Sequence, residues 1–140
     1  MINDYQLVLS DAQAITNASA ESTYYIDTLA AGNAITPGAT FTVKINTACT
    51  TADGGTIIAK LQTGTSSDLS TGEVTLITAP TLTVVSAAAG SAAGVTLFRG
   101  VIPTGVLRYL WAEFTLANNL TAGAFDAYIN LDSDITIDGK

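Results

Sequence analysis

The sequence predicts an all-β fold, a single-domain, jelly-roll-like sandwich or barrel of about eight to nine antiparallel strands. Three observations predict this fold class. Apolar and polar residues alternate in many short runs, whereas the spacing typical of an amphipathic helix does not recur. Clusters of Gly, Pro, Ser and Asn separate these runs. Thr and Val, which favour strands, are enriched within them.

The length of the chain predicts one domain. A chain of 140 residues has the size of a typical domain, which buries roughly two thirds of its unfolded surface. We therefore assign 1–140 to a single β domain, with a short N-terminal arm at about 1–20 and an acidic C-terminal tail at about 132–140.

The expected strands follow one another at short intervals along the chain. In TFTVKINT (40–47) and TIIAKLQT (56–63) every second residue is apolar, so one face of each strand is expected in the core. The intervening Asp53-Gly54-Gly55 predicts a tight turn, and therefore a hairpin of these two strands. The remaining strands are expected at 5–10, 23–28, 73–78, 81–86, 95–100, 107–116 and 125–132.

Helix is expected only as isolated turns. Ser10 and Gln13 have the spacing of a capping box for the segment DAQAI, and SSDLS (66–70) has the composition of a single turn. Three large apolar side chains have aliphatic or small neighbours two residues away and are expected in the core: Phe41, Phe114 and Phe125.

The strand LRYLWAEFTL (107–116) has two different faces. Its even-numbered residues, from Leu110 to Leu116, have the mixture of side chains found in a packed interior. Its odd-numbered face is amphipathic, because large aromatic rings with a polar group precede a carboxylate. We predict a protein interface there, with the candidate residues Tyr109, Trp111, Glu113 and, from a later strand, Tyr128. The alternative is that Trp111 is covered by a loop of its own chain.

Charge and residue inventory argue against several functions. Five scattered basic residues against twelve acidic ones give a formal net charge of -7, which disfavours nucleic acid and anionic membranes as partners. No stretch is long and apolar enough to span a membrane. The single Cys49 excludes an intrachain disulfide.

The same inventory predicts neither an enzyme nor a cofactor. Without histidine there is no Ser-His-Asp or Cys-His arrangement and no imidazole zinc site. No glycine motif has the spacing of a phosphate-binding loop. Calcium ligands are conceivable at Asp132, Asp134 and Asp138, but this run lacks the glycine and distal glutamate of a calcium loop. We therefore expect a solvated acidic tail, with no catalytic, cofactor or metal residues.

Four stretches of the chain carry a resemblance to a known family. They are LSDAQAITNASAESTYYIDT near the start, AKLQTGTSSD in the middle, and IPTGVLRYLWAEFTL and LTAGAFDAYINLD near the end. A Ser-Asp-Ala-Gln segment precedes a strand that ends in Ile-Asp. Later in the chain, a turn that contains proline leads into a strand with the sequence Arg-Tyr-Leu. In these features and in their order, the chain resembles the capsid cement, or decoration, proteins of tailed phages.

The resemblance implies a structural role. It implies a jelly-roll-like domain made in the host cytoplasm that binds, typically as a homodimer, to the outer surface of an icosahedral phage capsid. There it would tie subunits of the major capsid protein together against the pressure of packaged DNA. The alternative is a carbohydrate- or receptor-binding β-sandwich of a virion fibre or surface, in which exposed Tyr109, Trp111 and Tyr128 stack on sugars.

Overall fold

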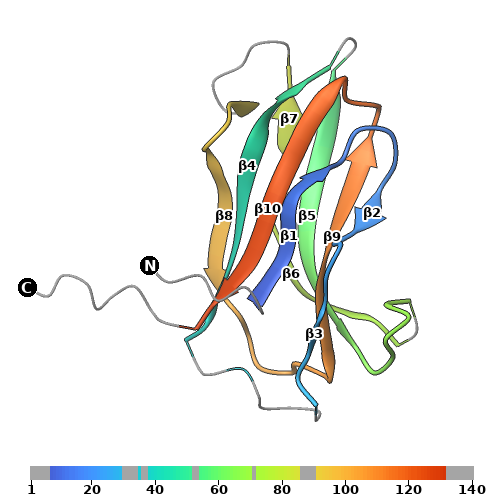
Figure 1. Cartoon of the computed structure of the whole chain (residues 1–140), viewed down its shortest axis with the longest axis vertical. Coiled ribbons are helices and arrows are strands. Elements are labelled where there is room, and N and C mark those ends of the chain that lie inside the picture. Colours follow the sequence, from blue (N-terminus) through green and yellow to red (C-terminus); the bar gives the residue numbers. More distant parts are fainter. Residues whose placement is uncertain are drawn as a thin grey trace, which may run out of the picture.

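The regular elements of the protein are strands. The computed structural model describes residues 7–29, 35, 38–51, 54–70, 72–85 and 91–131. This part of the chain forms ten strands, which Figure 1 labels: β1 (Val8–Ala14), β2 (Ala20–Glu21), β3 (Ile26–Asp27), β4 (Thr40–Thr50), β5 (Gly55–Gly64), β6 (Val74–Thr78), β7 (Leu82–Val84), β8 (Thr96–Val101), β9 (Tyr109–Ala117) and β10 (Ala122–Asn130).

The ten strands form two antiparallel sheets that pack face to face. The first sheet has the order β1-β10-β4-β8, and the second has the order β2-β9-β5-β6, in which β3 also pairs with β9 and β7 with β5. If β2 with β3 and β6 with β7 are each counted as one interrupted strand, the two sheets read 1-8-3-6 and 2-7-4-5. This is the strand order of a jelly roll, so the predicted all-β sandwich is confirmed.

The hairpin predicted between 40–47 and 56–63 is wrong. β4 lies in the first sheet, between β10 and β8, whereas β5 lies in the second sheet. Asp53 of the predicted turn lies outside the described residues, and Gly54 adopts a φ of 80°, a conformation that suits a tight connection. The apolar faces of β4 and β5 therefore face each other across the core from opposite sheets, instead of lying side by side in one sheet.

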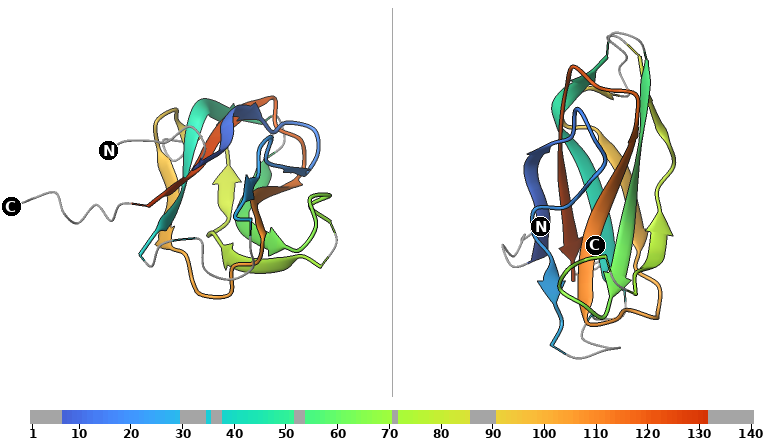
Figure 2. Two further views of the ribbon diagram at one scale, coloured as in Figure 1. Left: turned by 60° about the horizontal axis from the view of Figure 1, so that its bottom comes forward. Right: turned by 90° about the vertical axis from the view of Figure 1, so that its right-hand side faces the viewer.

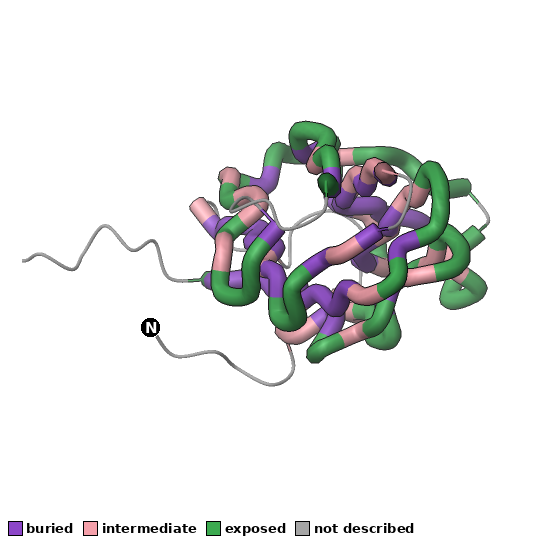
Figure 3. Tube along the Cα trace, turned by 90° about the horizontal axis from the view of Figure 1, so that it is seen from above, coloured by how far each residue is buried: buried purple, intermediate pink, exposed green. Residues whose placement is uncertain are grey.

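The core lies between the sheets and is filled by alternate residues of the long central strands. Viewed from above, the buried positions gather toward the middle of the sandwich (Figure 3). Phe41 and Phe125 from the first sheet and Phe114 from the second are all fully buried, as predicted. The rings of Phe114 and Phe125 lie 5.5 Å apart and join the two sheets directly.

The helical turn expected after Ser10 is also wrong, because this segment belongs to β1. The Ser10 hydroxyl does donate a hydrogen bond to Gln13 Oε1 (2.7 Å), but inside an irregular strand. The pairing of β1 with β10 shifts register twice. Within the second shift, between Ser10 and Gln13, Ala12 has a φ of 50°, and its N–H donates to the Asp126 carboxylate (2.7 Å).

One lateral side of the sandwich is closed by hydrogen bonds between the sheets, and we call it the closed side. The segment between β2 and β3 leaves its own sheet there, and the Tyr24 N–H donates to the carbonyl oxygen of Leu9 in β1 (2.9 Å). Ser22 fills the interruption in the ladder with β9, because its hydroxyl accepts from the Ala112 N–H (3.0 Å). The opposite side, between β8 and β6 with β7, we call the open side.

Candidate protein interface

The inward face of β9 is as predicted. Leu110, Ala112 and Phe114 are completely buried and belong to the core between the sheets. They alternate with Tyr109, Trp111 and Glu113, which therefore lie on the outer face of the second sheet. The sequence thus predicts correctly which residues of this strand face the core.

The prediction that Trp111 is available to a partner is wrong. Its side chain is 0% exposed in the single chain, although it lies outside the core cluster. Trp111 sits opposite Gln62 of β5, which is also buried. Within the described part of the chain, neither the Trp111 indole N–H nor Gln62 Oε1 has a hydrogen-bond partner. Trp111 is covered by its own chain, as the alternative predicted.

The loop that joins β5 to β6 lies beside the outer face of β9. It lies in front of the lower part of β9 in the right-hand view of Figure 2. Its Ser70, together with Glu73 just before β6, shares a pocket with Glu113 of β9, so the loop folds onto the outer face of the sheet. Alternation within a strand indicates the face of a side chain, but it does not indicate whether other parts of the chain cover that face.

Glu113 is held by neighbours in its own sheet. Lys60 Nζ lies 3.6 Å from its carboxylate, and Gln62 Nε2 donates to it at 2.5 Å. The Thr115 hydroxyl also donates to Glu113 (3.3 Å). About a quarter of the Glu113 side chain is exposed (26%), so these contacts stay partly solvated and stabilise the fold modestly. Glu113 forms part of an intramolecular network rather than a free binding group.

The pocket beside Glu113 is small and acidic. It has a volume of about 210 Å³ and is lined by Ser19, Ala20, Glu21, Ser70, Glu73 and Glu113. Three carboxylates from three separate segments thus line one pocket beside the middle of β9. Among the described residues, no group of three or more His, Cys, Asp or Glu side chains has a geometry that could hold a metal ion.

Tyr109 belongs to a different cluster, at the start of β9. Its ring meets Tyr25 edge to face, with centroids 5.6 Å apart, and the Arg108 guanidinium lies 5.1 Å from the ring centroid. Arg108 in turn donates two hydrogen bonds to Asp27, at 2.8 and 2.9 Å. These hydrogen bonds from Arg108 lower the pKa of Asp27, which keeps the pair charged well into acid.

The sequence did not predict the exposure of three residues at or close in sequence to this cluster. Tyr24 and Tyr25 are 44% and 45% exposed, and Leu29 is 78% exposed. We call the contacting rings of Tyr25 and Tyr109, together with Tyr24, which is next to Tyr25 in the chain, the tyrosine patch. The doubled tyrosine in TYYIDT was a usable signal, because a strand buried on one face does not bury both of two successive residues.

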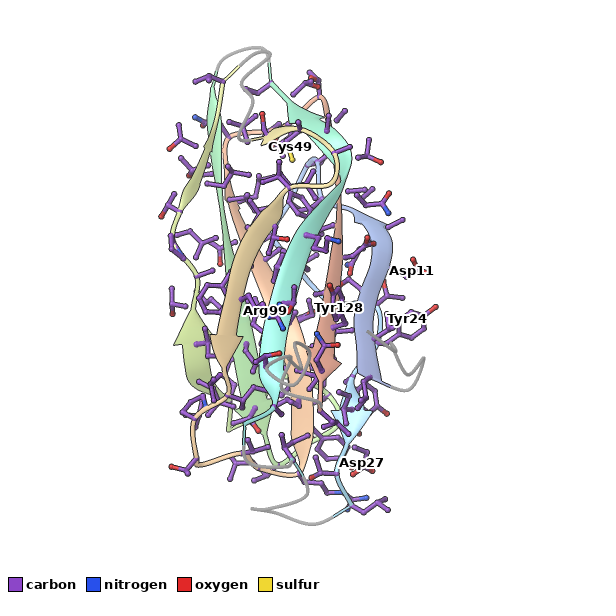
Figure 4. The ribbon with its side chains drawn as sticks, turned by 90° about the vertical axis from the view of Figure 1, so that its left-hand side faces the viewer. Asp11, Tyr24, Asp27, Cys49, Arg99 and Tyr128 are labelled. Atoms are coloured by element: carbon purple, nitrogen blue, oxygen red, sulfur yellow. The ribbon has the colours of Figure 1, made fainter. Side chains whose placement is uncertain are left out.

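Tyr128 does not join the other predicted interface residues. It lies on β10, in the first sheet, whereas Tyr109, Trp111 and Glu113 lie on β9, in the second. Tyr128 is only 9% exposed and pairs across the sheet with Val8 and Thr42. Figure 4 shows it on the outer face of its sheet, near Arg99. Burial raises its pKa, as does Asp126, while Arg99 acts in the opposite direction.

The sequence also has an acidic run near the C-terminus and a single cysteine. The candidate calcium ligands Asp132, Asp134 and Asp138 lie outside the described residues. Cys49 is buried, and desolvation raises its pKa to about 11, so the thiol is protonated at neutral pH.

In the described segments no helix is sufficiently long and apolar to cross a membrane.

The fold and the surface define a two-sheet jelly-roll protein with a small acidic pocket and an exposed tyrosine patch. The sequence model of the Bbp16 family matches residues 9–129, which span the sandwich from β1 to β10. The chain therefore belongs to the Bbp16 family, which carries a phage-related name. A search of curated proteins finds no significant match.

Proposed function

We propose that this protein is a capsid cement, or decoration, protein that binds the outer surface of an icosahedral phage head and stabilises contacts between major capsid subunits. Membership in the Bbp16 family over residues 9–129 is the observation that carries the proposal. The jelly-roll sandwich supports it, because this architecture occurs in viral capsid domains. The proposed partners are the major capsid protein and a second copy of this chain.

The surface of the domain is compatible with repeated, individually modest contacts. Only 12% of its residues are charged, so a contact with a shell would desolvate few charges. A symmetric shell presents the same binding position many times, and a dimer that bridges two positions gains affinity through effective concentration. A small domain of this kind reinforces a shell without needing a large hydrophobic interface.

Carbohydrate or receptor binding is the second candidate function, and the tyrosine patch favours it. Exposed aromatic rings beside hydrogen-bonding groups are suited to stack on sugars, and Tyr24 and Tyr25 are both nearly half exposed. Trp111 and Tyr128, which were expected to take part, are buried or nearly so. A glycan site would therefore rest on Tyr24, Tyr25 and Tyr109 alone.

Sedimentation separates these candidates. Purified protein is mixed with undecorated mature shells, with unassembled coat protein and, separately, with a panel of immobilised glycans. A cement protein pellets with the shells and ignores the glycans. Binding to glycans without binding to shells supports the second candidate, and binding to neither rules out both.

A further inference from the structure

The acidic pocket beside β9 collects carboxylates from three separate segments. Glu113 lies on β9, Glu21 ends β2, and Glu73 immediately precedes β6. Glu21 and Glu113 are directly opposite each other in the antiparallel ladder, so their side chains lie on the same face of the sheet. Like charges in such positions destabilise a sheet. The fold thus keeps an arrangement that lowers the stability of the free protein.

The pocket carries more negative charge than the chain neutralises. Lys60 Nζ lies 3.6 Å from the Glu113 carboxylate. In the part of the chain that the structure describes, neither Glu21 nor Glu73 has an ion-pair partner. Both residues are exposed, so a ligand can reach their carboxylates from solvent. Three carboxylates and one ammonium group leave an excess of two negative charges at neutral pH.

A buried amide next to the pocket gives a second, independent observation. Gln62 is 3% exposed, and its Nε2 donates to the Glu113 carboxylate (2.5 Å). Its Oε1 is bonded to the same carbon atom as Nε2, so this oxygen also lies close to Glu113. No group of the described segments donates to Oε1. A buried acceptor without a donor is costly, and a ligand that brings N–H groups into the pocket would satisfy it.

Hydrogen bonds hold two walls of the pocket in place. Ser19 Oγ accepts from the Leu116 N–H (2.9 Å), which ties the segment before β2 to β9. On the other side, the Ser70 N–H donates to the Asp68 carboxylate (3.0 Å) within the loop that joins β5 to β6. This loop lies in front of β9 in the right-hand view of Figure 2. Preformed walls reduce the entropy that a ligand must lose with the site on binding.

The acceptors of the pocket suit an organic cation better than a metal ion. The carboxylates of the described residues are not arranged to coordinate a metal together, so a ligand must reach acceptors that lie apart. A guanidinium group is planar and has five N–H donors, which can meet several separated acceptors at once. An ammonium group has its three donors on one atom and is more strongly hydrated. A volume of about 210 Å³ admits the end of one such side chain.

We infer that this pocket binds the guanidinium group of an arginine side chain presented by another protein. Glu21 and Glu73 supply the negative charge, and Gln62 Oε1 accepts from one of the N–H groups. An arginine within a protein fits better than the free amino acid, because the pocket repels the carboxylate of free arginine. The inference goes beyond the cement role and does not depend on it.

Titration with small molecules tests the inference in the full chain. Nα-acetyl-arginine amide carries the guanidinium group without a carboxylate, and Nα-acetyl-lysine amide carries an ammonium group instead. Chemical shifts of the protein follow the binding of each compound, and of free arginine and Ca²⁺. We expect the arginine amide to bind with a Kd on the order of 1 mM and to shift the signals of Glu21, Gln62 and Glu73. The lysine amide and free arginine should bind at least about fivefold more weakly.

Charge-neutral variants locate the site. Glu21→Gln and Glu73→Gln should each weaken binding of the arginine amide about fivefold, the effect of one partly solvated, charge-assisted hydrogen bond. Glu21→Gln should also raise the melting temperature of the free protein, because it removes a contact between like charges. Asp11→Asn is the matched control, since it changes the net charge equally at an exposed residue of β1 outside the pocket. Its affinity should stay within about twofold of wild type.

Several results would overturn the inference. Absence of binding by the arginine amide would do so, and equal affinity for the lysine amide would mean that the pocket recognises charge alone. Equal weakening by Asp11→Asn and the two pocket variants would show that net charge attracts the ligand. Tighter binding of Ca²⁺ at the same residues would make the pocket a metal site. None of these results bears on the cement role, and a protein that binds no shells would leave this inference standing.

Discussion

Gln13 and Thr23 hold the two sheets together at the closed side. The Thr23 N–H donates to Gln13 Oε1 (3.0 Å), although Gln13 lies on β1 in the first sheet and Thr23 follows β2 in the second. Gln13 Nε2 donates to the carbonyl oxygen of Glu21 (2.8 Å), and the Ser10 hydroxyl also donates to Gln13 Oε1. One side chain thus satisfies backbone groups that the irregular strands leave without a ladder partner.

Replacing Gln13 should therefore destabilise the fold although no core side chain is lost. We expect Gln13→Ala to cost about 1–3 kcal/mol, since it leaves several donors and acceptors without partners. Asp11→Ala, on the same strand and exposed, is the control and should change stability by less than about 0.5 kcal/mol. Urea unfolding measures both. Equal small effects would show that these bonds do not hold the closed side.

The contact between Phe114 and Phe125 should couple the two sheets energetically. Each ring is fully buried, so Phe114→Ala and Phe125→Ala should each cost about 3–5 kcal/mol. Because the rings touch, the double variant should depart from the sum of the single ones by at least about 0.5 kcal/mol. Phe41→Ala, at a third buried ring, should cost a similar amount. Losses below about 1 kcal/mol for all three would mean that the strand faces are misassigned.

Trp111 should behave as a structural residue. Its complete burial outside the core predicts that Trp111→Ala lowers stability by about 3–5 kcal/mol. Tyr109→Ala, on the same face of β9 but half-buried, should cost less. Thermal and urea melts compare the two. A folded Trp111→Ala protein of nearly wild-type stability that fails to self-associate or bind shells would instead restore Trp111 as an interface residue.

The stability of the protein should fall at alkaline pH. Burial raises the pKa of Cys49 from 9.0 to about 11 and also raises that of Tyr128. The unfolded thiol ionises first, so stability is fully present below pH 9 and is lost as the pH rises toward 11. Cys49→Ala should make this alkaline loss smaller in calorimetry. An unchanged pH profile in the variant would show that Cys49 ionises normally in the folded state.

Local alternation allowed most of the strands to be predicted, because a strand buried on one face shows its period in the sequence itself. The expected run at 107–116 became Tyr109–Ala117, and the run at 40–47 became the first part of Thr40–Thr50. Even the burial of Phe41, Phe114 and Phe125 follows from that period. β2 was missed, because two residues are too few to show alternation.

Sheet assignment and surface accessibility were not predictable in the same way. A glycine at Gly54 predicts a turn, but only the competition for the core decides that β4 and β5 enter different sheets. Trp111 has the sequence signature of an exposed amphipathic face, yet it is completely buried within its own chain. Gln13 resembles half of a capping box, and only the packing of β1 against the segment after β2 shows its real partners.

The most direct test of the cement role is the temperature at which DNA-filled shells rupture. Mature shells that lack the decoration protein are heated with and without saturating amounts of the purified chain, and DNA release is followed with an intercalating dye. The account predicts that release shifts to higher temperature in proportion to the fraction of occupied sites. Release at an unchanged temperature on shells that sedimentation shows to be fully occupied would contradict it.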